Sequence, residues 1–264
     1  MGCRGPVPAI CAVFFLSFSI SVYAADPVDY AEWAAFLKAH VRSGLADYPG
    51  MREDRQTLDR YLDRVAGVPV EVLAEAGREE RIAFWINLYN ASVIRTVLDA
   101  YPIKWLDQIP AVFDIRTVRV GGEYLSLGDL RDHVLREGFH DERILTAISS
   151  GRMDSPRLGR EPFRGSSLEE QLNQAAQAFV EDGTKNEIVP GGKKIVLSPV
   201  FDEFGEDFLL NFHAREPVKG FSERESAVIG FLLHHLRDPE KRLFLNSARY
   251  KIRYREPDPR LNSV

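Results

Sequence analysis

The sequence is poor in cysteine. Its only two, Cys3 and Cys11, lie within the first 24 of its 264 residues. That segment has the features of a secretory signal: a positive charge at Arg4, an apolar run over 9–22, and small residues before a cleavage site ahead of Ala25. Cleavage there leaves a mature chain with no cysteine, which excludes disulfides, thiol catalysis and thiolate metal sites. We expect an exported protein that folds without a disulfide.

The sequence also lacks an apolar segment long enough to span a membrane comfortably. The N-terminal apolar run is shorter than the roughly 20 residues that a transmembrane helix needs, and Asp26 and Pro27 follow it closely. An uncleaved anchor is the alternative to a cleaved signal. A lipoprotein is disfavoured because Cys11 precedes the apolar core of the signal. We expect a periplasmic or secreted protein with no stable membrane insertion after cleavage.

No stretch of the chain concentrates positive charge. The formal net charge is −5, with 34 Lys and Arg interspersed among 39 Asp and Glu, and loss of Arg4 with the signal makes it one unit more negative. This pattern argues against nucleic acid as a partner. The mature chain of about 240 residues can bury one substantial core, so 25–264 is expected to form a single globular domain.

Familiar catalytic motifs are absent. The sequence has no glycine-rich phosphate loop, no Gly-x-Ser-x-Gly nucleophile elbow and no paired-histidine metalloprotease helix. A helix would point the adjacent His234 and His235 about 100° apart, which makes them poor joint ligands. The acidic residues within 202–207 lack the glycine and alternating ligands of a calcium loop, so a solvated helix face is favoured over a calcium site. We expect no metal and no cofactor.

The strongest helical pattern spans residues 81–100. Apolar side chains recur there at helical spacing on two faces, and Tyr101-Pro102 ends the pattern. An apolar residue set on two faces indicates packing on more than one side. The sequence therefore predicts a buried central helix.

Other segments complete the predicted architecture. Further helices are expected over 26–41, 58–65 and 69–77 before the central helix, and again after residue 126. Two β-hairpins are predicted, one over 117–127 with a Gly121-Gly122 turn and one over 187–197, together with a terminal strand over 249–254. Without alternating strand–helix units, the fold class is α+β: a helix-rich single domain with two short β-hairpins around a central buried helix.

Two asparagines stand out on that central helix. Asn87 and Asn90 lie one turn apart, hence on one side of an otherwise apolar helix. A buried carboxamide without partners costs on the order of 1–3 kcal/mol, so the pair either braces a neighbouring loop or lines a pocket. The irregular stretch Ser149–Gly165 is a long connection between helices, which indicates either a functional loop or surface disorder.

An ordered series of motifs resembles the domain of unknown function 547 family. They are Ala83–Asn90, Tyr101-Pro102, Tyr124–Leu127, Asp132–Arg136, Asp141–Ile144, Ser155-Pro156-x-Leu158, the helix from Leu168, Val196–Ser198, Asp207-Phe208 and Leu261-Asn262. The resemblance covers about 78–262. It implies bacterial and plant relatives and no settled activity.

One departure from that family concerns the irregular loop. Family members commonly carry a Cys-x-x-x-x-Cys-Pro pattern, and the matching positions here are Ser150 and Ser155, followed by Pro156. A serine replacing a thiol nucleophile needs a nearby base, for which His133 is the matching candidate. Its neighbour Asp132 cannot easily reach the His133 ring from the same helix, which weakens a triad.

Two functional hypotheses follow from these residues. The first is a ligand- or peptide-binding module of the cell envelope, with a pocket bounded by Asn87, Asn90, His133 and the loop Ser150–Ser155. The second is a hydrolase or acyl-transfer enzyme that uses Ser155 and His133. A purely structural role for these groups is the third possibility. Three arginines of the loop suit a small anionic ligand or a peptide: Arg152, Arg157 and Arg160. We predict the binding module, with the enzyme as the alternative.

Overall fold

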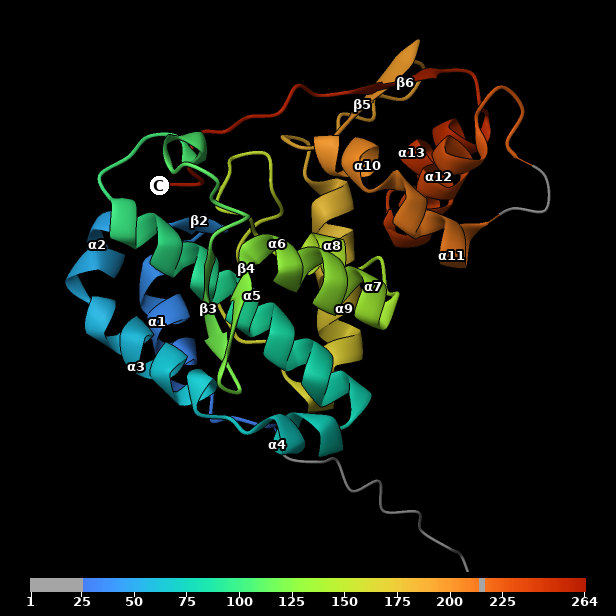
Figure 1. The fold of residues 1–264 in the computed structure, drawn as a ribbon. Coiled ribbons are helices and arrows are strands. Elements are labelled where there is room, and N and C mark those ends of the chain that lie inside the picture. The colour runs from blue at the N-terminus through green and yellow to red at the C-terminus, as the bar shows by residue number, and fades with distance from the viewer. Residues whose placement is uncertain (1–25, 214–216) are drawn as a thin grey trace, which may run out of the picture.

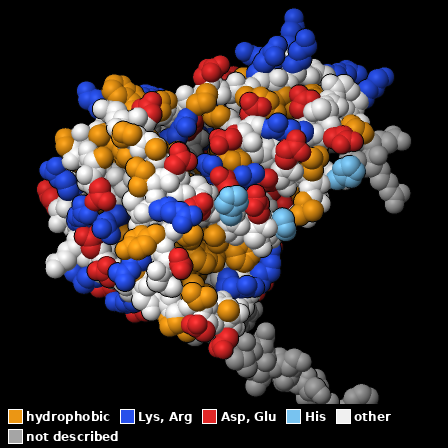
Figure 2. Space-filling view, viewed as in Figure 1, with side chains coloured by type: hydrophobic (Ala, Val, Ile, Leu, Met, Phe, Trp, Pro, Cys, Tyr) orange, Lys and Arg blue, Asp and Glu red, His pale blue; other side chains and the backbone are white. Residues whose placement is uncertain are grey.

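A computed structural model describes residues 26–213 and 217–264 (Figure 1). The predicted signal, residues 1–24, lies outside the described residues. Within the described part, no helix is both long and apolar enough to cross a membrane. Acidic and basic side chains are interspersed over the face drawn in Figure 2.

The central helix is α5 (Arg78–Ala100), and the prediction of a buried central helix is confirmed. Its side chains are buried on nearly every face, and it ends at Tyr101, before Pro102. Four helices precede it: α1 (Ala31–His40), α2 (Tyr48–Glu53), α3 (Arg55–Ala66) and α4 (Val70–Glu75). The first helix begins later than predicted, because Asp26 does not cap it. The Asp26 carboxylate instead accepts a hydrogen bond from the backbone N–H of Gly165 at 3.1 Å.

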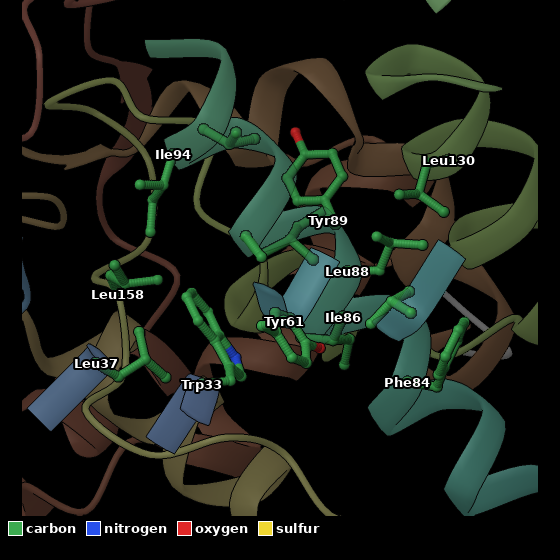
Figure 3. Packing of buried hydrophobic residues seen from close by; sticks show 14 of the residues in the cluster. Trp33, Leu37, Tyr61, Phe84, Ile86, Leu88, Tyr89, Ile94, Leu130 and Leu158 are labelled. Carbon is green, nitrogen blue, oxygen red and sulfur yellow. The ribbon is translucent and has the colours of Figure 1, made fainter. Parts of the chain in front are cut away.

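The first hydrophobic cluster forms where α1 and α3 pack on α5. The rings of Trp33 and Tyr61 stack with centroids 5.4 Å apart, and both are fully buried (Figure 3). Aliphatic side chains of α5, including Ile86 and Leu88, fill the remaining space. Burial of this kind is the main stabilising term for a chain without disulfides.

The first hairpin is confirmed. Strands β3 (Arg116–Val120) and β4 (Glu123–Ser126) pair antiparallel, with positive φ at both Gly121 and Gly122, as a tight two-residue turn requires. A helix was predicted after this hairpin, but it is not a regular α-helix. Short helices α6 (Leu127–Asp129) and α7 (Glu137–Phe139) flank a π-helical stretch, Leu130–Arg136. Such wide turns are rare and frequently occur at functional sites.

The second half of the chain forms its own hydrophobic cluster, rich in phenylalanine. Phe208 and Phe231 meet edge to face at its centre, with ring centroids 4.8 Å apart. Helix α9 contributes to both clusters and so joins them. The elements of this half are α8 (Ile144–Ala147), α9 (Leu168–Glu181), β5 (Lys194–Leu197), α10 (Pro199–Glu203), α11 (Leu209–Phe212), α12 (Glu223–His235), α13 (Pro239–Asn246) and β6 (Lys251–Tyr254).

The second predicted hairpin is wrong. The segment before the turn contributes one isolated bridge, Glu187 to Val196, and β5 instead pairs in parallel with β6. Both segments bury one isoleucine in the second cluster, Ile188 before the turn and Ile252 in β6, but only β6 pairs with β5 along its whole length. The terminal strand is therefore correct and its partner was not foreseen. The fold class is nevertheless as predicted, a helix-rich α+β structure with short two-stranded sheets.

After β6 the chain returns to the first cluster (Figure 1). There Leu261 is buried, and Asn262 exchanges backbone hydrogen bonds with two distant segments: its N–H donates to Gly151 and its carbonyl accepts from Ala46. Ala46 belongs to a small antiparallel pair, β1 (Val41–Arg42) and β2 (Leu45–Ala46). The last residues thus tie the loop after α8 to the N-terminal part of the fold.

A buried carboxyl group lies between α8 and α11. Glu142 is 6% exposed, and its Oε2 accepts a hydrogen bond from Asn211 Nδ2 at 2.6 Å. Burial raises the pKa of this carboxyl above its ordinary value. The folded chain therefore binds this proton more tightly than the unfolded chain does. Its stabilising contribution is present at low pH and is lost as the pH rises through the folded pKa.

Replacing Glu142 with glutamine is therefore expected to stabilise the protein near pH 7 by about 1 kcal/mol, because the amide keeps an oxygen for Asn211 without a buried charge. The gain should shrink towards pH 4, where the wild-type carboxyl becomes protonated. Urea unfolding at both pH values measures it, with the exposed Glu123→Gln as control. An equal effect at both pH values would contradict the buried-charge explanation.

Candidate binding site

The two asparagines of α5 brace the irregular loop. Asn90 Oδ1 accepts from the Ser149 N–H at 2.8 Å, and its Nδ2 donates to the Ala147 carbonyl at 3.1 Å. Asn87 Oδ1 accepts from the Phe163 N–H at 3.0 Å, and its Nδ2 donates to the Phe163 carbonyl at 2.8 Å. One amide holds the beginning of the loop and the other holds its end. Of the two roles expected from the sequence, bracing is the one that the hydrogen bonds support.

A buried chain of hydroxyl and amide groups fixes the serines of this loop. Ser155 Oγ donates to the Arg152 carbonyl at 2.7 Å and lies 3.2 Å from Ser149 Oγ. Asn262 Nδ2 donates to Ser149 Oγ at 3.1 Å, and the Tyr48 hydroxyl donates to Asn262 Oδ1 at 2.7 Å. The hydroxyl that faces Ser155 is therefore that of Ser149, whereas the family pattern had pointed to Ser150.

The structure does not bring His133 and Ser155 together. The His133 side chain is 67% exposed, and its Nδ1 pairs with Glu137 Oε2 at 2.9 Å, which raises the pKa of His133. Ser155 is buried, and its hydroxyl is committed to the Arg152 carbonyl. A serine nucleophile needs a base within hydrogen-bond reach, and no hydrogen bond joins these two side chains. The geometry thus gives the hydrolase hypothesis no support.

The loop arginines named from the sequence already have partners. Arg152 binds the Asp154 carboxylate through two nitrogens, at 3.1 and 2.9 Å. Arg157 donates to Asp182 at 2.6 Å and to the Ser43 carbonyl at 2.7 Å. In a separate contact, Arg160 donates to the Lys38 carbonyl at 2.9 Å. The hydrogen bonds of these arginines hold the loop in its conformation. Most of their donor groups are therefore already paired within the protein.

A cavity of about 260 Å³ lies on one side of the loop, where the two hydrophobic clusters approach each other. We call it the Tyr89 cavity. Its polar wall includes Tyr89 of α5, Arg131 of the π-helical stretch and Ser150 of the loop. Its apolar wall is formed by Phe113, Leu145, Ile148, Pro156, Pro199, Val200, Phe204 and Pro257.

The Tyr89 hydroxyl is a buried donor with no partner. The residue is fully buried, and no hydrogen bond from its hydroxyl is found among the described residues. Figure 3 shows this hydroxyl pointing away from Trp33 and Tyr61, out of the first cluster. Burial raises the pKa of Tyr89, so the phenol stays neutral and keeps its proton to donate. Tyr89 is also a lining residue of the cavity, so this unpaired donor lies close to it.

Arg131 stands beside that hydroxyl in a fixed orientation. Its guanidinium makes two hydrogen bonds to Asp132, at 2.9 and 2.8 Å, and lies 5.4 Å from the Phe113 ring centroid and 5.1 Å from that of Phe204. Its third nitrogen, Nη1, is 3.9 Å from the nearest oxygen of Glu203, beyond a hydrogen bond. That nitrogen is left with donors for a further acceptor.

Comparison with known proteins places part of this site in a family. Residues 73–180 match the family model described as "Protein of unknown function, DUF547". Over this region the chain is similar to the DUF547 family. The DUF547 region runs from α4 to α9 and contains Tyr89, Arg131 and the irregular loop Ser149–Gly165, which we call the serine loop. Val200, Phe204 and Pro257 of the cavity lie beyond it. No curated protein and no solved structure matches the chain.

Sequence reasoning missed the two most informative residues of the Tyr89 cavity. Tyr89 fits the apolar spacing of the central helix, so it was assigned to the core. The only available signal was a hydroxyl on a helix with no evident hydrophilic face. Arg131 was missed because a π-helical stretch has no recognisable periodicity in sequence. The structure shows that Tyr89 and Arg131 line the same cavity.

Proposed function

We propose that this protein is an exported binding module of the cell envelope, which holds a small ligand or the end of a peptide in the Tyr89 cavity. The observation that carries the proposal is the unpaired hydroxyl of Tyr89, a fully buried residue that lines the cavity. Leaving such a donor unsatisfied costs about 1–3 kcal/mol, so a ligand that accepts its hydrogen bond gains binding free energy. Export rests on the signal-like sequence of residues 1–24.

The walls of the cavity define the chemistry of the ligand. Phe113 and Phe204 both lie beside the Arg131 guanidinium and, with the prolines, offer an apolar surface. Tyr89 and Arg131 supply donors close together. A ligand with an apolar body and one carboxylate or carbonyl group matches both walls. Arg131 is paired with Asp132, as Arg152 and Arg157 are paired with their own carboxylates, so the preference for an acceptor group rests on the remaining Nη1 donors of Arg131 and on the Tyr89 hydroxyl.

Binding of acetyl-leucyl-leucine, compared with its C-terminal amide, tests the proposal. Calorimetry or ligand-observed NMR should detect the free acid and a weaker interaction with the amide. Tyr89→Phe removes only the hydroxyl and should weaken binding of the acid about tenfold, the equivalent of about 1.4 kcal/mol. Folding should be unharmed, because that hydroxyl has no partner to lose.

Tyr61→Phe is the matched control. Tyr61 is also fully buried with an unpaired hydroxyl, but it packs in the first cluster and does not line the Tyr89 cavity. Its substitution should leave peptide binding unchanged. Binding that survives Tyr89→Phe, or is lost equally in both variants, would contradict the proposal.

A further inference from the structure

A second cavity, of about 640 Å³, lies beside the Tyr89 cavity and shares Asp154 and Pro199 with it. We call it the Lys185 cavity. It is formed between the irregular loop, the segment after α9 and the returning C-terminal segment, which contributes Arg255 and Arg260. The ligand binding proposed for the Tyr89 cavity does not require the Lys185 cavity.

The cavity is built around a buried amine. Lys185 is 7% exposed, and its Nζ donates to the Met153 carbonyl. No carboxylate of the described residues lies within 4 Å of this nitrogen, although an ammonium group has three N–H donors. Burial lowers the pKa of Lys185, because the charges of Asp182, Asp154 and Asp258 compensate the cost of the buried ammonium only in part.

The other cations in the wall differ from Lys185 because each has an acidic partner. Arg157 pairs with Asp182, Arg260 pairs with Asp258, and Arg255 lies 3.7 Å from Glu187. The acids of the wall are Asp154, Glu256 and Asp258. Asp154 is occupied by Arg152, and its carboxylate also accepts from the Asp258 N–H. Lys185 is thus the one lining cation, within the described part, that lacks an acidic partner.

We propose that the Lys185 cavity binds an anionic group, a carboxylate or a phosphate, which takes the place of the missing carboxylate. Lys185 supplies the charge and its remaining N–H donors, and the arginines of the wall add positive potential around it. The buried position of the amine favours a ligand that enters the cavity over a counterion at the surface. This site is independent of the ligand proposed for Tyr89.

Pyridoxal 5′-phosphate is a suitable probe because it joins an anion to an aldehyde. Its aldehyde carbon forms a bond with Lys185 Nζ and water leaves, giving an imine that borohydride reduces to a stable secondary amine. Peptide mapping by mass spectrometry should show Lys185 labelled at least fivefold faster than Lys193 and Lys194, which are exposed. Pyridoxal without the phosphate should show no such preference. Equal labelling by both reagents, or none at Lys185, would overturn the proposal.

Competition then identifies the anion without any substitution. Inorganic phosphate and acetate are added separately at constant ionic strength before labelling. Protection of Lys185 by phosphate assigns the site to phosphate groups, and protection by acetate alone assigns it to carboxylates. No protection by either, at concentrations that leave Lys194 labelling unchanged, would refute an anion site.

A variant pair checks the same proposal in solution. Lys185→Met keeps much of the length of the side chain and removes its charge, and Lys194→Met does so at an exposed position of β5. The protecting anion should raise the melting temperature of the wild type and of Lys194→Met, and should lose that effect in Lys185→Met. An undiminished rise in Lys185→Met would overturn the proposal.

Discussion

Asn87→Ala is expected to lower the free energy of unfolding by about 3–5 kcal/mol. Its carboxamide accepts from the Phe163 N–H and from Trp33 Nε1, the latter at 3.3 Å, and it donates to the Phe163 carbonyl. Alanine leaves two donors and an acceptor without partners in or near the core, at about 1–3 kcal/mol each, and also leaves a small void. The loss is large because one amide serves three groups.

Urea unfolding followed by circular dichroism measures this loss. Asn246→Ala is the matched control: Asn246 is exposed, and its single side-chain hydrogen bond is to a carbonyl of its own helix. The control should change stability by less than about 0.5 kcal/mol. Limited trypsin digestion should also cut the Asn87→Ala protein faster after Arg160 or Arg164, since that end of the loop has lost its brace. A loss below about 1 kcal/mol would show that the loop is held by other contacts.

Local patterns predicted the parts of the fold that depend on local physics. The apolar spacing of residues 81–100 revealed a helix buried on several sides, and Gly121-Gly122 revealed a turn that needs positive φ twice. The one-turn spacing of Asn87 and Asn90 placed them correctly on one side of α5. It did not reveal their partners, because Ser149 and Phe163 are about 60 to 75 positions away.

Non-local pairing accounts for what the sequence did not reveal. A turn signal at 190–192 suggested a hairpin, but β5 found its partner in β6, more than fifty residues later. Burial of one side chain does not decide between the two segments, because Ile188 and Ile252 are both buried in the second cluster. The Tyr89 cavity is likewise formed by distant segments, since its wall combines α5, the loop and Pro257. The residue spacing within one segment cannot predict a contact between segments that are far apart in the sequence.

The second large effect is expected at Asn262, which ties the serine loop to α2. Asn262→Ala should cost about 2–4 kcal/mol, because the Tyr48 hydroxyl and Ser149 Oγ lose a buried partner together. Asn262 is 5% exposed, so water cannot readily replace its side chain. Ser263→Ala, one position further on and only partly buried, should be nearly neutral.

A double-mutant cycle distinguishes this bond from a general loss of packing. Tyr48→Phe removes the hydroxyl that donates to Asn262 Oδ1 at 2.7 Å and leaves the ring in place. The double variant should be about 1–2 kcal/mol more stable than the sum of the two single losses predicts, because the bond can be lost only once. Strict additivity in urea unfolding would mean that the bond between Tyr48 and Asn262 adds no stability of its own. Any loss in Asn262→Ala would then come from its bond to Ser149 and from packing.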